Sequence, residues 1–282
     1  EERLNTLLQK LMAENDLDLW VLITREYNED PVVRTLLPPT WLNARRRTIL
    51  VFAKDPKTGA VERVAMTRYA FGKFFPSVWN KEKQPDQWQA LADYILAKAP
   101  KKIGINTSEG YGIADGLAHT DYQGLYSALP PRYRQRLVTA EALAVAWIET
   151  RTPKEMLLFQ QLTEITHRII AEAFSTEVIT PGVTTTEDVV WWLREKVSGL
   201  GLDTWFHPTV DVQRNEASDL YAFDGQQKLD VIQASDLLHC DFGITYLTLN
   251  TDCQELAYVL RPGEKKAPAY LEAALAAGNR VQ

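Results

Sequence analysis

Residues 239–255 read HCDFGITYLTLNTDCQE and are the most informative segment in the second half of the chain. It contains two short β-favouring runs that turn back on each other near Tyr246 and Leu247. If these runs pair antiparallel about that turn, Asp241 opposes Asp252. Directly opposed side chains share one face of a sheet, with Cβ atoms roughly 5 Å apart.

Two carboxylates at that distance repel each other unless a cation or a shared proton lies between them. Hard divalent cations take carboxylate oxygens, and two such ions roughly 3.5–4 Å apart can share a bridging carboxylate. Asp241 and Asp252 are therefore candidate metal ligands. The same spacing also occurs in hairpins whose carboxylates diverge into solvent, so the pair alone leaves both interpretations open.

The residues around the two aspartates resemble a known motif. Asp-Phe-Gly at 241–243 and Asn-Thr-Asp at 250–252 resemble the first two metal ligands of the pita-bread metallopeptidases, which include aminopeptidase P, prolidase, methionine aminopeptidase and creatinase. The resemblance implies that Asp241 chelates one metal ion and that Asp252 bridges two. Most relatives continue after the second aspartate with a Thr-Arg type sequence, whereas this chain has Cys253, Gln254 and Glu255.

Length and charge set the general class. With 282 residues, 45% hydrophobic and 24% charged, the chain is expected to form two domains. Its net charge of −6 argues against a nucleic-acid or anionic membrane partner. No apolar run reaches the roughly 18 residues of a membrane-spanning helix. Because the chain begins Glu-Glu-Arg, a removed signal peptide is one option, and both the cytoplasm and the periplasm or exterior stay open as compartments.

Residues 1–150 alternate between helical and strand patterns, which predicts an α/β domain. The expected helices cover 1–18, 84–99, 114–128 and 140–150, and the expected strands cover 18–26, 45–53, 61–67 and 101–106. Its densest positive cluster is Arg45, Arg46 and Arg47. Such a cluster is typical of a solvated strand edge, and a contact with an anion or a partner subunit is the alternative.

Residues 151–282 are expected to form the second domain. Pro153 suits the first position of a helix over 154–174, and the threonines at 184–186 suit the start of a helix that ends near 197. The Arg-Thr-Pro-Lys-Glu and Pro-Gly-Val phrases that open these segments also occur in the peptidase family. The resemblance thus implies a creatinase-like N-terminal α/β domain followed by an incomplete pita-bread catalytic domain.

Two histidines lie near the aspartates in the sequence: His207 lies upstream, and His239 is the first residue of the 239–255 stretch. A strand is predicted over 202–213 with His207 beside Trp205 and Phe206, a setting typical of a structural histidine. The family, however, places a histidine on the strand at the mouth of the active site, which implies that His207 is catalytic, binding substrate or assisting proton transfer. His239 shares a face with Asp241 in extended structure and is a candidate to support that ligand.

The resemblance implies two divalent metal ions in a complete parent enzyme, with Mn expected and Zn or Co as alternatives. The family completes its metal site with one His and two Glu residues well after the hairpin. No His follows His239, and Glu264 and Glu272 come too early. The chain is therefore interpreted as the first part of a longer enzyme and is not expected to be active alone.

The implied activity is hydrolysis of small peptides at an Xaa-Pro bond. A creatinase-like amidinohydrolase and a non-catalytic interaction protein on the same scaffold are the alternatives. A small peptide is the expected partner, and relatives with such an N-terminal domain often dimerise, so a homodimer is also allowed. Cys240 and Cys253 would oppose each other in the predicted hairpin, yet we expect two buried thiols in place of a disulfide.

Overall fold

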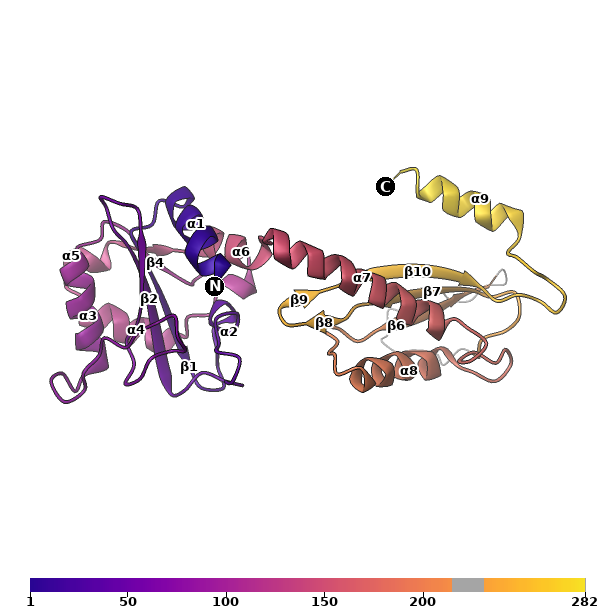
Figure 1. Ribbon diagram of the computed structural model, residues 1–282, viewed down its shortest axis with the longest axis horizontal. Helices are drawn as coiled ribbons and strands as arrows, with labels where there is room; N and C mark the ends of the chain where they lie inside the picture. Colours follow the sequence, from indigo (N-terminus) through magenta and orange to yellow (C-terminus); the bar gives the residue numbers. More distant parts are fainter. Residues whose placement is uncertain (215–230, 282) are drawn as a thin grey trace. The chain divides into compact units, whose positions relative to one another are not determined.

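The computed structural model describes residues 1–214 and 231–281 (Figure 1). The chain divides into two compact units, Glu1–Thr152 and Pro153–Gln282. The second unit begins with the first residue of α7 (Pro153–Ala173). Proline is well suited to that position because the first N–H groups of a helix have no partner within it.

The first unit is built on a mixed five-stranded sheet of order β3-β2-β1-β4-β5. Central β1 pairs antiparallel with β2 and parallel with β4. The strands are β1 (Leu19–Arg25), β2 (Arg47–Lys54), β3 (Val61–Ala65), β4 (Ile103–Ile105) and β5 (Leu137–Thr139). The α/β character expected from the sequence is confirmed, although the short strand β5 was not among the predicted strands.

Helices cover both faces of this sheet (Figure 1). Trp20 and Leu22 of β1 pack in one cluster, while Leu19, Val21 and Ile23 pack in another on the opposite face. This arrangement explains why β1 is a continuous apolar run. The helical segments are η1 (Arg3–Leu7), α1 (Leu8–Glu14), α2 (Pro31–Arg34), α3 (Gln87–Lys98), η2 (Gly112–Ala114), α4 (His119–Ala128), α5 (Pro131–Arg134) and α6 (Glu141–Glu149).

The second unit contains an antiparallel sheet of order β10-β7-β6 and a separate short hairpin. The sheet strands are β6 (Thr209–Gln213), β7 (Leu237–Phe242) and β10 (Cys253–Tyr258), and the hairpin is β8 (Thr245–Tyr246) with β9 (Leu249–Asn250). Helices α7 and α8 (Thr186–Gly199) pack on one face of the sheet. Thr185 and Asp188 form a capping box that starts α8.

The two faces of this sheet differ in chemistry. Along β7, Leu238, Cys240 and Phe242 are buried in the cluster with α7 and α8. His239 and Asp241 alternate with them, and therefore point to the other face. That second face is mainly polar, and the candidate site lies on it.

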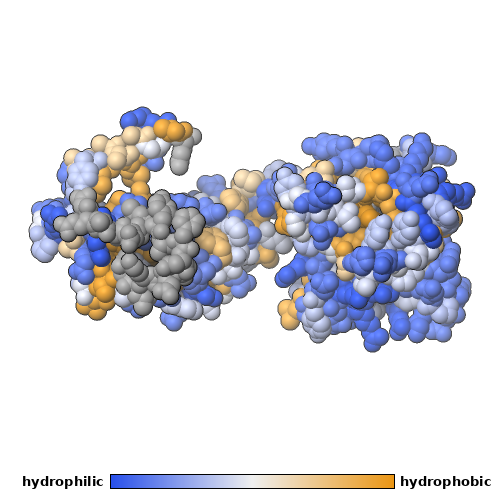
Figure 2. All heavy atoms as spheres, turned by 180° about the vertical axis from the view of Figure 1, so that it is seen from behind, coloured by the Kyte–Doolittle hydropathy of each residue, from blue (hydrophilic) through white to orange (hydrophobic). Residues whose placement is uncertain are grey.

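Helix α9 (Ala269–Gly278) ends the described chain and has no buried residue. It stands apart from the sheet of its own unit in Figure 1, and Figure 2 shows it as an arm of mainly apolar residues. Among the described residues, no helix has the length and apolar character needed to cross a membrane.

The two cysteines are buried and form no disulfide, as expected. They do not oppose each other, however. Cys240 faces Glu255 and Cys253 faces Phe242, so the predicted cross-strand pairing of the thiols is wrong. Burial, followed by the charge of Asp241, raises the pKa of Cys240 to about 12, and burial raises the pKa of Cys253 as well.

Both thiols should therefore resist alkylation in the folded chain near neutral pH, because the thiolate is the reactive form. Intact-mass measurement without reductant should find almost no alkyl groups on the native chain and two after denaturation. A denatured chain that takes up none would show a disulfide.

Candidate functional site

The strand pairing around the two aspartates differs from the predicted one by two residues. Asp241 faces Gln254, not Asp252, and Thr245 faces Asn250 in the hairpin beyond. The turn is thus formed by Leu247 and Thr248, one residue later than expected. Leu247 has a positive φ of 56°, which residues other than glycine rarely adopt. Because leucine is not typical of such turns, the residue type did not predict the turn at this position.

Close packing at Gly243 fixes this register. The backbone N–H of Thr251 donates to the carbonyl of Ile244 at 2.9 Å, and the N–H of Ile244 donates to the Thr251 hydroxyl at 3.0 Å. A Cβ at Gly243 would lie 2.1 Å from the Thr251 carbonyl oxygen. Only glycine allows the two strands to approach this closely.

Asp241 and Asp252 nevertheless share the polar face. A shift of two residues preserves the side on which a strand residue lies, because the side-chain period is two. Asp252 is now a diagonal neighbour of Asp241 and is exposed, whereas Asp241 is half-buried. Burial raises the pKa of Asp241, and the charge and hydrogen bonding of Asp252 raise it further.

A row of polar side chains leads to Asp241 across the same face. The Gln254 amide donates to Asp241 Oδ2 at 3.4 Å, and its carbonyl oxygen lies 3.0 Å from His239 Nε2. His239 Nδ1 lies 3.8 Å from the Asp211 carboxylate. His239 thus reaches Asp241 through Gln254. Gln254 could not be identified from the sequence, because the predicted register did not place it opposite Asp241.

The arrangement fits part of a metal site. The Oδ1 atom of Asp241 is buried and has no hydrogen-bond partner in the described part of the chain. An unpartnered buried carboxylate oxygen beside a second carboxylate is well suited to a hard cation. Residues 1–214 and 231–281 contain no group of three or more His, Cys, Asp or Glu residues placed to hold an ion, so the described ligand set consists of these two carboxylates.

The strand predicted over 202–213 is shorter in the structure, and His207 lies before its first residue. Strand β6 begins at Thr209, and Pro208 lacks the N–H that a longer ladder would need. The His207 ring packs edge-on against Trp191 at 6.1 Å between centroids, and its Nδ1 lies 3.4 Å from Nη1 of Arg194. Its contacts are therefore with α8. No contact within the described residues joins it to Asp241 or Asp252.

Comparison with solved structures identifies the fold. No family model and no curated protein matches the sequence. Solved structures do match, and they share the pita-bread fold of the Xaa-Pro peptidases. At 10–16% identity the likeness shows the fold alone. The chain therefore has this fold over the span that it covers.

Three of these structures illustrate the match. An Xaa-Pro dipeptidase from Bacillus anthracis aligns with a TM-score of 0.60 and 16% identity, over 91% of this chain and 64% of its own. An X-Pro aminopeptidase from Thermotoga maritima gives 0.60 and 14%, over 88% and 64%. Aminopeptidase P of Escherichia coli gives 0.59 and 13%, over 92% and 63%. The chain thus spans a little under two thirds of the length of these proteins.

Replacement of Gly243 tests the packing that sets the register. Gly243→Ala places a methyl group against the Thr251 carbonyl, so it should destabilise the second unit by about 1–3 kcal/mol in urea unfolding. Gly199→Ala is the matched control, because nothing lies within 4 Å of a Cβ there. Equal effects of the two substitutions would contradict the assigned register.

Replacement of Asp241 tests the electrostatics. Because the pKa of Asp241 is raised in the folded chain, ionisation of this group disfavours folding, and stability should rise as pH falls through that pKa. Asp241→Asn should therefore raise the urea midpoint of the metal-free chain at neutral pH, and the gain should shrink in acid. Asp211→Asn, at a carboxylate that is 68% exposed, should leave the midpoint nearly unchanged. A lower midpoint for Asp241→Asn at neutral pH would refute this account.

Proposed function

We propose that the chain carries the first part of a metal-dependent Xaa-Pro peptidase site, with Asp241 and Asp252 as its first ligands. The observation that supports this proposal most directly is the unpartnered Oδ1 of Asp241 beside the Asp252 carboxylate. The fold shared with Xaa-Pro peptidases supports Xaa-Pro peptides as the substrate class. Two divalent ions, with Mn preferred over Zn or Co, are part of the proposal.

The proposed chemistry divides between the ions and the chain. When bound, a divalent ion would act as a Lewis acid toward the scissile carbonyl. Asp241 and Asp252 would hold it, and Gln254 would orient the Asp241 carboxylate through its amide. His207 would contact the substrate from the edge of the sheet, next to Trp191, which is 49% exposed.

Two carboxylates do not fill the coordination sphere of Mg-like or Mn-like ions, which take roughly six ligands. We therefore expect the 282-residue chain to bind Mn weakly, with a dissociation constant of about 10⁻⁴ to 10⁻³ M, the weak end of carboxylate sites. Calorimetric titration with MnCl₂ should show this binding in wild type and in Asp211→Asn, but not in Asp241→Asn. An absence of binding to wild type would exclude the metal assignment. Tight uptake of two ions would show that the ligand set is already complete.

The same chain should not hydrolyse Xaa-Pro dipeptides or tripeptides, whereas a version extended past Gln282 that supplies further ligands should. Creatine belongs in the same substrate panel, because its turnover by the extended version would favour the amidinohydrolase alternative. In the version that shows turnover, His207→Ala should lower kcat/KM with unchanged Mn content. Unchanged turnover would remove His207 from the mechanism.

The non-catalytic alternative has one observation in its favour, since the described residues supply only two carboxylates. It predicts that the extended version also lacks turnover. A small peptide partner and a homodimer are also part of the proposal. Sedimentation of the purified chain measures its oligomeric state.

A further inference from the structure

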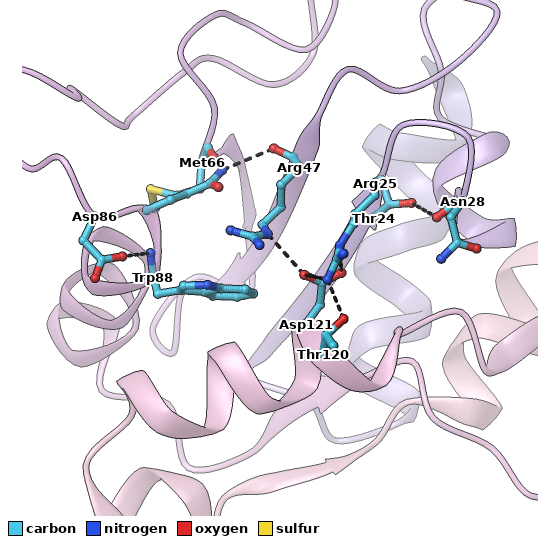
Figure 3. A network of polar contacts seen from close by, with 10 residues as sticks. Thr24, Arg25, Asn28, Arg47, Met66, Asp86, Trp88, Thr120 and Asp121 are labelled. Atoms are coloured by element: carbon cyan, nitrogen blue, oxygen red, sulfur yellow. Dashed lines mark hydrogen bonds and ion pairs between the residues drawn. The ribbon is translucent and has the colours of Figure 1, made fainter.

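The first unit brings two arginines directly opposite each other. Arg25 at the end of β1 is the Cα partner of Arg47 at the start of β2. Like charges in directly opposed positions destabilise a sheet. Asp121 on α4, only 1% exposed, lies between them and offsets one of the two positive charges (Figure 3). The cluster of Arg25, Arg47 and Asp121 thus retains a charge of about +1.

Asp121 uses only part of the donor capacity of these arginines. Arg25 donates from Nε to Oδ2 at 2.8 Å and from Nη2 to Oδ1 at 3.1 Å, and its Nη2 also reaches the Thr120 hydroxyl at 2.5 Å. Arg47 donates to Oδ1 from Nε alone, at 3.1 Å. Within the part of the chain that the structure describes, no acceptor contacts Nη1 of Arg25 or either terminal nitrogen of Arg47.

Arg47 is nevertheless held in a fixed place. Its guanidinium stacks 4.5 Å above the ring of Trp88 (Figure 3). Trp88 in turn packs on Gly124 of α4 so closely that a Cβ there would lie 2.4 Å from the indole. Asp121 and Gly124 lie one turn apart on α4. Asp121 accepts a hydrogen bond from Arg47, and Gly124 leaves room for the indole on which Arg47 stacks.

The two terminal nitrogens of Arg47 form the edge of a guanidinium that typically binds oxyanions. The two terminal nitrogens of a guanidinium present parallel N–H groups that match the two oxygens of a carboxylate or phosphate. Both arginines are accessible, with side chains 42% and 33% exposed. The neighbouring Arg45 is engaged elsewhere, stacked on Trp41 and Tyr69, so the arginine run in the sequence does not act as one patch.

We propose that the cluster of Arg25, Arg47 and Asp121 is a binding site for a small oxyanion, a carboxylate or a phosphate, on the first unit. Arg47 would bind two oxygens through its terminal nitrogens, and Arg25 would contribute Nη1 and the second positive charge. Asp121 would position both arginines. The site is independent of the two aspartates of the second unit and of the activity proposed for them.

The test is a titration of the ¹⁵N-labelled 282-residue chain followed through its arginine Nε–H signals. Sodium phosphate and sodium acetate are added in separate series, with ionic strength kept constant by NaCl. We expect a saturable shift of the Arg25 and Arg47 signals in at least one series. The salt that saturates at the lower concentration identifies phosphate or carboxylate as the preferred ligand. Linear drift in both series would overturn the proposal.

Variants separate a built site from general charge. Arg47→Lys keeps the charge but loses the paired donors, so it should weaken binding roughly tenfold, as should Arg47→Gln, with binding read from the Arg25 signal. Arg63→Gln on β3 is the matched control, because within the described residues the Arg63 side chain bonds the Asn5 amide oxygen and no part of the proposed site, so this substitution should leave binding unchanged. Circular dichroism checks that each variant is folded. Wild-type affinity in Arg47→Lys, or an equal loss in Arg63→Gln, would contradict the proposal.

Discussion

The pairing of Ile244 with Thr251 beside Gly243 is the constraint on which the candidate site depends. Thr251 is fully buried, and its hydroxyl also meets the hydroxyl of Thr166 on α7 at 2.8 Å. Its carbonyl accepts from the Trp205 indole at 2.8 Å. One residue therefore joins the hairpin to the helix layer and to the segment that leads into β6. The absence of a side chain at Gly243 makes this convergence sterically possible.

That register places the Asp241 and Asp252 carboxylates on the exposed face, where their mutual repulsion lowers the stability of the fold. Asp241 is drawn partly out of water next to another carboxylate, and the amide of Gln254 is the donor that reaches it. Such an arrangement is unfavourable for an isolated fold. Sites that break the local rules of stability in this way are where function is expected, because the fold gains nothing from them.

The sequence was sufficient for some features and insufficient for others, for physical reasons. Long periodic segments such as 154–174 and the strand around Trp20 were predictable, because burial on one or both faces leaves a clear pattern. The register of 239–255 was not, since a turn at Leu247 carries no Gly or Asn signal. The slip was by two residues, so the shared face of Asp241 and Asp252 was still predicted correctly, whereas the pairing of Cys240 with Cys253 was not.

Features that depend on contacts between distant segments were beyond sequence reasoning. The strand predicted over 202–213 loses its first half because Pro208 ends the ladder, and this moves His207 toward α8. Arg25 and Asp121 are far apart in the chain, so nothing in the arginine run at 45–47 identified their joint contact with Arg47.

Both units bring like charges together, but among the described residues only the first unit offsets them with an ion pair. In the first, like charges on opposed strands, Arg25 and Arg47, are brought together by a buried aspartate from the helix layer. In the second, Asp241 and Asp252 are diagonal neighbours, and the lowering effect of His239 on the Asp241 pKa is smaller than the raising effects of burial and of Asp252. No Lys or Arg side chain forms an ion pair with either aspartate within the described residues. A repulsion that the chain leaves uncompensated is one that a bound cation can relieve, and this difference between the units is the physical basis for placing a metal at the hairpin.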